Sequence, residues 1–232
     1  MMLYYDARMA SVLTADQESI GVAARRLAEG GLVAFPTDTV YGVGAHGFMP
    51  QAVERLYAAK RRPRGKPIAL LLAAGEEIRQ VARDVPPLAW ELAERLWPGG
   101  LTLVLLRSSA VPDVVCGGGD TVAVRVPDHP VALALIRALG APLAASSANL
   151  SGQPDPVTAE EVQEALGEAV DLILDGGRCP GGVPSTLLDV TRKPPRLLRP
   201  GAISLEELRA ILPDLSTYPS STCSFHCHAY RY

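Results

Sequence analysis

The chain has 232 residues, of which 48% are hydrophobic and 20% charged, and its formal net charge is −3. This length suits one large domain, or one domain with a small appendage, and the composition is typical of a folded globular protein rather than a disordered one. The small net charge disfavours a globally basic nucleic-acid binder, although it leaves room for a local basic patch.

Targeting and redox signals are few. No apolar run reaches the roughly 18 residues that a membrane helix needs, and Met1 to Ser11 holds no apolar core of a signal peptide. The four cysteines lack the spacing of a disulfide framework, since two are far apart and two lie in the last ten residues: Cys116, Cys179, Cys223 and Cys227. We therefore expect no membrane association and a reducing, cytoplasmic setting.

The first half of the chain is predicted to mix helices with short strands. Thr14 to Glu29 has the apolar spacing of a helix, and Thr14 and Gln17 have the spacing of a capping box. Leu32 to Phe35 is predicted to be a strand, and the polar, glycine-punctuated stretch Thr37 to Gly47 a loop. The elements expected next are a helix from Pro50 to the cations at Lys60, a strand at Pro67–Ala73, helices at about Glu76–Arg83 and Leu88–Leu96, and a strand at Leu101–Leu106.

The second half continues in the same way. The expected strands are Thr121–Val126, Pro142–Ala145, Val170–Leu174, Thr186–Val190 and Arg196–Leu198, and the expected helices are Val131–Leu139, Thr158–Leu166 and Leu205–Leu212. Thr158 and Ser204 are predicted N-caps, each with a glutamate at capping-box spacing. Strands and helices do not alternate strictly, which favours an α/β fold with a twisted, open sheet of mixed direction over a barrel.

The composition changes near the end of the chain. From Ser216 onward it is rich in Ser, Thr, Tyr, Cys and His and has no hydrophobic periodicity. We therefore expect one domain over residues 14–213 and a C-terminal tail, 214–232, that is disordered or loosely packed. Cys223, His226, Cys227 and His228 are too compressed for a tetrahedral zinc site, so no metal ligands are assigned there.

Two polar loops are candidates for a ligand site because each follows a predicted strand. They are Thr37–Gly44 and Ser146–Gly152, and open α/β sheets bind ligands beyond their strand ends. Ser146, Ser147 and Asn149 form either ordinary side-chain turns or a set of donors aimed at phosphate. A serine nucleophile is disfavoured, because the segment is not a nucleophile elbow.

The segment from Lys60 to Lys66 carries five cations: Lys60, Arg61, Arg62, Arg64 and Lys66. One reading is a solvated surface loop. Another is a cradle for polyphosphate, for which arginine offers a planar fork and lysine a point charge. RNA binding is a third reading, although no aromatic residues interleave with the cations to stack bases.

Several motifs in order resemble the YrdC family, over about Ile20 to Leu212. They are Pro-Thr-Asp-Thr-Val-Tyr-Gly at 36–42, Lys60-x-Arg62 followed by Ser147-x-Asn149, Thr121–Pro127, Pro184-Ser185-Thr186 and Leu198-Arg199-Pro200-Gly201. The resemblance implies a twisted α/β domain with a large concave, basic cavity. It also implies an enzyme that uses ATP with Mg²⁺ and forms threonylcarbamoyl-AMP and pyrophosphate from L-threonine and bicarbonate or CO₂. The resemblance further implies that this adenylate is passed to a tRNA threonylcarbamoyl transferase complex that modifies tRNA.

The resemblance also assigns residues to the two substrates. The residues expected to hold ATP are Lys60, Arg62, Lys66, Thr121, Ser147, Asn149, Asp155 and Arg199, and those expected to hold threonine are Thr39, Tyr41, Arg125, Ala145 through its backbone, and Ser185. Lys60 and Arg62 are expected to be catalytic by offsetting charge on the triphosphate, since such transfers run on positioning and charge stabilisation. The metal ligands stay unassigned.

Two positions depart from the family pattern. Leu71 stands where longer relatives often have histidine, so it cannot donate a hydrogen bond there. Asp155 stands beside the nucleotide where serine is common, and its carboxylate would repel phosphate unless Mg²⁺ bridges them. Two other classes of protein remain open. One is an RNA-binding module with the same basic cavity and weak RNA contact, and the other is a carbamoyl-transfer enzyme like the related domain of hydrogenase maturation proteins.

Overall fold

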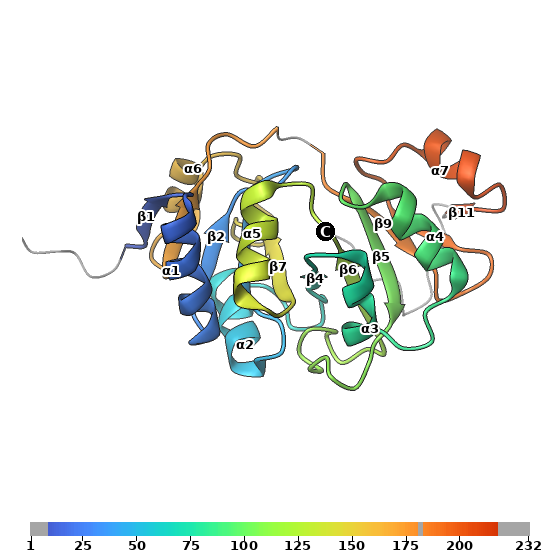
Figure 1. Cartoon of the computed structure of the whole chain (residues 1–232), viewed down its shortest axis with the longest axis horizontal. Coiled ribbons are helices and arrows are strands. Elements are labelled where there is room, and N and C mark those ends of the chain that lie inside the picture. Colours follow the sequence, from blue (N-terminus) through green and yellow to red (C-terminus); the bar gives the residue numbers. More distant parts are fainter. Residues whose placement is uncertain (1–8, 181–182, 218–232) are drawn as a thin grey trace, which may run out of the picture.

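The computed structural model describes residues 9–180 and 183–217, and within these ranges the chain forms a single mixed sheet of eleven strands. The strand order is β1-β8-β2-β3-β7-β4-β6-β5-β9-β10-β11, and parallel and antiparallel pairs both occur. The strands are β1 Ser11–Thr14, β2 Val33–Phe35, β3 Gly42–His46, β4 Ala69–Leu71, β5 Leu101–Leu106, β6 Thr121–Arg125, β7 Leu143–Ser147, β8 Leu172–Asp175, β9 Thr186–Asp189, β10 Arg196–Arg199 and β11 Ser216–Thr217. The expectation of a twisted, open α/β sheet of mixed direction is confirmed (Figure 1).

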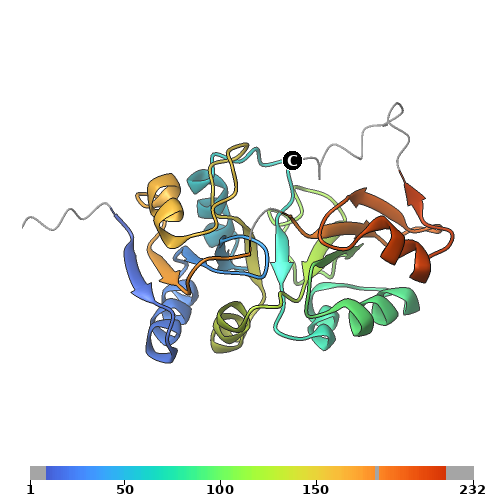
Figure 2. The same ribbon diagram turned by 90° about the horizontal axis from the view of Figure 1, so that it is seen from above.

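Helices cover this sheet on both sides. They are α1 Gln17–Ala28, α2 Pro50–Ala59, α3 Ile78–Val81 with the 3₁₀ turn Gly75–Glu77 before it, α4 Pro87–Leu96, α5 Pro130–Leu139, α6 Ala159–Leu166 and α7 Leu205–Ile211. α1 and α5 pack together over β2, β7 and β8 through one apolar cluster, which includes Leu27, Phe35, Leu135, Leu143 and Leu174. Figure 2 shows α1 and α5 (blue and olive) on one side of this half of the sheet and α6 (gold) on the other.

The segment Thr37–Gly47 is not wholly a loop, because residues Gly42–His46 form β3 in the middle of the sheet. β3 pairs antiparallel with β2 and β7. Glycine is depleted in strands, so the sequence Gly-Val-Gly predicts a loop. The structure uses these glycines for close packing: a Cβ on Gly44 would lie 2.8 Å from Cγ of Leu143. The prediction was therefore wrong at this strand for a reason of tertiary packing.

Helix caps follow the sequence with one exception. Thr158 accepts a hydrogen bond from the backbone of Glu161, and Ser204 forms a full capping box with Glu207. The expected cap at Thr14 is wrong, because Asp16 caps α1 by accepting from Ser19 N at 2.8 Å. A carboxylate satisfies a free N–H there and also complements the helix dipole.

The folded sheet includes residues on both sides of the expected 14–213 range. β1 begins at Ser11 and pairs with β8. At the other end Leu215 is buried, and Ser216–Thr217 pairs with β10. The rest of the expected tail, residues 218–232 with both of its cysteines and histidines, lies outside the described residues. Cys116 and Cys179 are buried free thiols.

One glycine fixes how the last part of the sheet meets the chain before β9. A Cβ on Gly201 would lie only 2.3 Å from the carbonyl oxygen of Pro184, so this backbone approach excludes any other residue without a shift. The adjacent Ala202 N donates to the same oxygen at 2.9 Å.

Across 9–180 and 183–217, no helix is long and apolar enough to cross a membrane.

Candidate functional site

A cavity of about 570 Å³ opens where the two polar loops meet the ends of the central strands. Ligand cavities of 300–1,000 Å³ are usual for small molecules. All the residues expected at the two substrates line it except Thr121, the first residue of β6: Thr39, Tyr41, Lys60, Arg62, Lys66, Arg125, Ala145, Ser147, Asn149, Asp155, Ser185 and Arg199. The lining found in the described residues has five cationic side chains and one carboxylate, that of Asp155.

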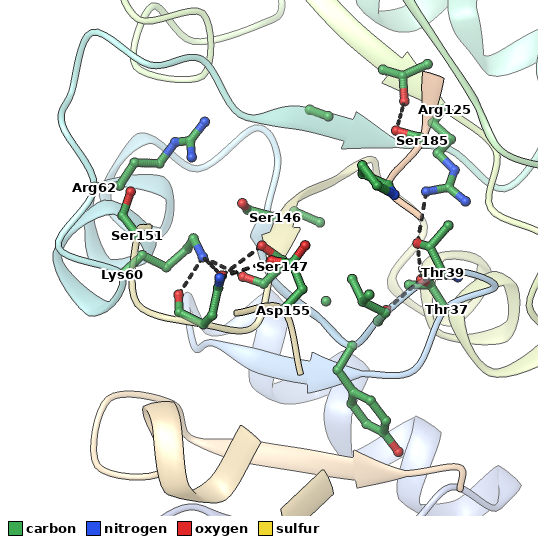
Figure 3. A pocket seen from close by; sticks show the side chains of 18 of the residues that line it. Thr37, Thr39, Lys60, Arg62, Arg125, Ser146, Ser147, Ser151, Asp155 and Ser185 are labelled. Carbon is green, nitrogen blue, oxygen red and sulfur yellow. Dashed lines mark hydrogen bonds between the residues drawn. The ribbon is translucent and has the colours of Figure 1, made fainter. Parts of the chain in front are cut away.

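The labelled side chains divide the cavity into two ends (Figure 3). Lys60, Arg62 and Ser151 lie at one end, which we call the cation end. Thr37, Thr39, Arg125 and Ser185 lie at the other, which we call the hydroxyl end. Ser146, Ser147 and Asp155 lie between them.

The cationic segment after α2 contributes only part of its charge to the cavity. Lys60, Arg62 and Lys66 line the cavity, whereas Arg61 and Arg64 are exposed, and Arg64 pairs with Glu54 at 2.5 Å. Arg61 has a positive φ of 49°, which turns the chain directly after the helix. The segment is therefore neither a uniformly solvated loop nor a diffuse basic patch, because its successive cations alternate between the cavity and the solvent.

Lys60 is almost wholly buried, at 1% exposed, and its ammonium is surrounded by oxygen. Nζ donates to the carbonyl oxygens of Ser147 at 2.5 Å and Asn149 at 2.6 Å, and to Oδ1 of Asn149 at 3.0 Å. Burial lowers the pKa of Lys60 to about 7; the charge of Arg62 acts in the same direction, and Asp155 opposes it. Three oxygen acceptors can be satisfied together only by the ammonium form.

The amide of Asn149 extends this arrangement across the loop. Its Oδ1 also accepts from the Ser147 hydroxyl at 2.8 Å, and its Nδ2 donates to Gln153 O at 2.5 Å and to Asp155 Oδ1 at 3.0 Å. The backbone N–H of Ser151 donates to the carbonyl of Lys60 at 2.9 Å. Lys60 and Asn149 thus fix the shape of the 147–155 loop, which is a fixed frame rather than a flexible serine turn.

Arg62 holds its guanidinium against the chain that follows it. Nε donates to Lys66 O at 3.1 Å and NH2 donates to Pro67 O at 2.8 Å. The hydroxyl of Tyr57 donates to the same Lys66 carbonyl at 2.8 Å. This fold of the loop orients a planar, permanently charged fork at the cavity wall, which suits phosphate oxygens.

Arg125 is one of two arginines at the hydroxyl end, where Arg199 also contacts Ser185. Its Nε donates to Gly99 O at 2.8 Å, its NH2 pairs with Asp38 Oδ2 at 2.5 Å, and its NH1 lies 3.5 Å from Thr39 Oγ1. The backbone N–H of Asp128 donates to the other oxygen of Asp38 at 3.2 Å. Two edges of the guanidinium are therefore held by protein.

The threonines before β3 form a small hydroxyl chain. Thr37 Oγ1 donates to Val40 O at 2.7 Å and lies 3.0 Å from Thr39 Oγ1. With its proton directed to Val40, the Thr37 oxygen is the acceptor for Thr39. Both side chains are buried and face the hydroxyl end.

Ser185 lies between two other polar groups at the same end. Its hydroxyl is 2.7 Å from Thr102 Oγ1 and 3.0 Å from the NH2 of Arg199, which also donates to Ser185 O at 2.8 Å. Arg199, expected at ATP, is therefore in direct contact with Ser185, expected at threonine.

Tyr41 borders the cavity, yet its hydroxyl is used elsewhere. It donates to Gly177 O at 2.8 Å and accepts from Gly176 N at 3.3 Å, and the residue is fully buried. Burial raises the pKa of the Tyr41 phenol above its ordinary value, and the charge of Asp175 adds to this effect. The side chain ties the Thr37–Gly42 segment to the loop after β8.

His46 and His129 make structural contacts with nearby backbone. Nδ1 of His46 accepts from Phe48 N at 3.2 Å, and Nδ1 of His129 caps α5 by accepting from Val131 N at 3.3 Å. Within residues 9–180 and 183–217 there is no cluster of three or more His, Cys, Asp or Glu side chains able to hold a metal ion.

The residues that sequence reasoning missed are Asp38, Thr37 and Thr102. Asp38 and Thr37 lie inside the 36–42 motif, and a carboxylate between two threonines was a signal for a charge partner. Thr102, in contrast, is a lone hydroxyl in the apolar strand β5, and only the pairing of β5 with β9 brings it to Ser185.

The mixed α/β sheet, with a cavity of small-molecule size beyond the ends of its strands, defines an α/β ligand-binding protein, and comparison with known proteins gives the family. The chain belongs to the Sua5/YciO/YrdC family, whose model, described as "Telomere recombination", matches residues 25–201.

Named relatives agree with this family. The threonylcarbamoyl-AMP synthase of Pyrococcus abyssi is 45% identical over 205 residues, which are 88% of this chain and 60% of the relative. That of Bacillus subtilis is 44% identical over 201 residues, or 86% and 58%. The crystal structure of P. abyssi Sua5 complexed with L-threonine matches with a TM-score of 0.89 and 42% identity, over 96% of this chain and 66% of that one. The chain thus spans about 60% of the length of these two curated relatives.

Proposed function

We propose that the protein forms threonylcarbamoyl-AMP and pyrophosphate from L-threonine, bicarbonate or CO₂, and ATP. The observation that carries this proposal is the division of the cavity into a cation end and a hydroxyl end. The first suits a triphosphate and the second suits a small hydroxy amino acid with a carboxylate. The name and threonine complex of the relatives support the same activity.

The chemistry proceeds in two steps. The amine of threonine attacks the carbon of CO₂, supplied as such or from bicarbonate, and loses a proton to give a carbamate. A carbamate oxygen then attacks the α-phosphorus of ATP, and the bond to the β-phosphate oxygen breaks to release pyrophosphate. Neither step needs a covalent enzyme intermediate, so the protein contributes position and charge.

The cation end holds the nucleotide in this proposal. Arg62 and Lys66 receive the phosphates, and Ser147 lines the framed loop beside them with its hydroxyl proton directed to Asn149 Oδ1. Lys60 acts from behind that loop, because its three N–H groups are already directed at loop oxygens. Thr121 is assigned to ATP by the resemblance alone. Any Mg²⁺ arrives on the triphosphate and offsets its charge; Asp155, the carboxylate of the described lining, is the side chain that would hold it.

The hydroxyl end holds threonine. NH1 of Arg125, whose contact with Thr39 Oγ1 is a long one of 3.5 Å, binds the carboxylate, and the hydroxyls of Thr39 and Ser185 and the backbone of Ala145 complete the site. Leu71 lines the same cavity and can offer only apolar contact. The carbamate therefore forms between the two ends, near Ser146 and Ser147.

The product is consumed by a tRNA threonylcarbamoyl transferase complex in the cytoplasm. The decisive experiment incubates the protein with ATP, bicarbonate and labelled threonine and assays pyrophosphate and labelled threonylcarbamoyl-AMP. We expect both products, and each of the three substrates should be required. Salt-sensitive RNA binding without threonine-dependent pyrophosphate release would instead indicate an RNA-binding module.

A further inference from the structure

Asp38 is a charged residue of the 36–42 motif to which the reaction above gives no part. Its side chain is 18% exposed and that of its partner Arg125 is 8% exposed, so this ion pair is largely buried. Both carboxylate oxygens are used, one by the guanidinium and one by the backbone N–H of Asp128. Such a carboxylate is held in a fixed position and orientation.

The consequence for Arg125 is geometric. Gly99 O holds Nε and Asp38 holds NH2, whereas NH1 makes only the long contact of 3.5 Å to Thr39 Oγ1 and has a second N–H to offer a ligand. Without Asp38 the guanidinium would keep the bond from Nε to Gly99 O and the long contact of NH1 with Thr39, and it could rotate about the Nε contact. A ligand carboxylate then would meet no fixed pair of donors.

The consequence for charge is as important. Burial lowers the pKa of Arg125 and the like charge of Arg199 acts in the same direction, whereas Asp38 opposes both. The Arg125–Asp38 pair is close to neutral as a unit. Threonine arrives as a zwitterion with no net charge and suits this neutral pair, whereas a phosphate dianion would be repelled by the Asp38 carboxylate at short range.

The other cations of the lining make this discrimination necessary. Lys60, Arg62, Lys66 and Arg199 border the same cavity, which must take both a triphosphate and an amino acid. A fifth cation without Asp38 would attract phosphate to the wrong end. Repulsion built against the wrong ligand is a general route to specificity.

We propose that Asp38 is a positioning and specificity-determining residue, which presents one edge of Arg125 to the amino-acid substrate and keeps phosphate groups out of the hydroxyl end. This inference rests on the proposed function, because it takes threonine as the ligand of Arg125. It adds a role for a side chain that does not itself touch the substrate.

The test measures the dissociation constant of threonine by calorimetry at increasing inorganic phosphate, for wild type, Asp38→Asn, Asp38→Glu and Asp128→Asn. Asp128→Asn is the matched control, since it removes the same charge from an exposed neighbour that contacts Arg125 in no recorded bond. Wild type and Asp128→Asn should show a threonine constant that phosphate barely changes. In Asp38→Asn, phosphate should compete with threonine and bind about tenfold more tightly than in wild type.

Asp38→Glu keeps the charge but misplaces it, so threonine should weaken while phosphate still fails to compete. A purely structural role for Asp38 predicts a different result for Asp38→Asn: threonine binds more weakly and the affinity for phosphate does not rise. This result would overturn the proposal. Circular dichroism checks folding, and Asp38→Ser replaces Asp38→Asn if the latter does not fold.

Failure of the proposed function is separable from failure of this inference. A wild-type protein that binds threonine but forms no adenylate contradicts the function only, because the phosphate competition is read without turnover. If wild type does not bind threonine, phosphate is titrated directly. If Asp38→Asn then binds phosphate more tightly than wild type, and the double variant Asp38→Asn/Arg125→Met does not, the charge role of Asp38 is supported. If Asp38→Asn shows no gain in phosphate affinity, the charge role is contradicted.

Discussion

The guanidinium of Arg199 donates to both the carbonyl and the hydroxyl of Ser185, at 2.8 and 3.0 Å. Arg199 ends β10, and Ser185 stands immediately before β9, so the contact closes the antiparallel pair of strands at the cavity. The proposed ATP and threonine sites are therefore in physical contact at this point.

This contact predicts coupling between the two substrates. Ser185→Ala should raise the threonine requirement more than the ATP requirement, whereas Arg199→Lys should raise both, since an ammonium cannot reproduce the arginine fork. In a double-mutant cycle on threonine binding, the two changes should couple by about 0.5–3 kcal/mol. Additive effects would show that the Arg199–Ser185 contact has no role in binding threonine.

The two faces of the cationic segment predict unequal effects of neighbouring arginines. Arg62→Ala should lower the ATP-dependent rate roughly ten- to a hundredfold, because it removes charge-assisted contacts of about 1.5–3 kcal/mol. Arg61→Ala is the matched control; Arg61 is exposed and should matter little. Steady-state pyrophosphate release measures both. Wild-type turnover in Arg62→Ala would exclude the ATP assignment, and equal losses would favour a diffuse basic patch.

Proton uptake should accompany nucleotide binding through Lys60. Burial lowers its pKa from the ordinary 10.5 to about 7, so at pH 8 part of the free protein holds it as the amine, which leaves one of its three loop oxygens without a donor. The negative charge of ATP favours the ammonium, and binding at pH 8 should therefore take up as much as about one proton, but little at pH 6.

Calorimetry at pH 8 in two buffers of different ionisation enthalpy measures this uptake. Lys60→Arg is the control, because arginine stays charged throughout this range. Buffer-independent heats in wild type would contradict the prediction.

The lowered pKa of Lys60 also makes stability depend on pH. The unfolded chain binds this proton more tightly than the folded protein, so the Lys60 contribution to the free energy of unfolding rises with pH between about 7 and 10.5.

Tyr41 should matter for stability rather than for threonine affinity. Tyr41→Phe leaves Gly177 O without its donor and should lower the unfolding free energy by about 1–3 kcal/mol, as read from urea denaturation. Thr39→Val provides the contrast, since it keeps the shape of the side chain but should raise the KM for threonine severalfold. A large rise in that KM with unchanged stability in Tyr41→Phe would restore a direct role for its hydroxyl.

Most helices and strands were predictable because their periodicity and caps are local properties, as at Thr158 and Ser204. β3 was not, since Gly42 and Gly44 are chosen by neighbours that pack against them from distant parts of the chain. The edge strands β1 and β11 were missed as well; each is short and has a pairing partner on one side only.

The candidate site was also only partly predictable from the sequence. The motifs located the cavity residues, but the direction of each hydrogen bond depends on tertiary structure. The sequence shows Lys60 as one cation among five, whereas the fold turns its ammonium onto the backbone of residues that follow it by 87 and 89 positions. Thr102 became relevant only because β5 and β9 are adjacent in the sheet.

The close approach at Gly201 makes a residue without any polar side chain a determinant of substrate geometry. A single added methyl group would have to displace the Pro184 carbonyl and the Ser185–Thr186 peptide, or else the chain just after Arg199. The same movement would separate Arg199 from Ser185 or carry both away from Thr102. Altered preference among amino-acid substrates could therefore arise by mutation at position 201, with every polar group of the cavity unchanged.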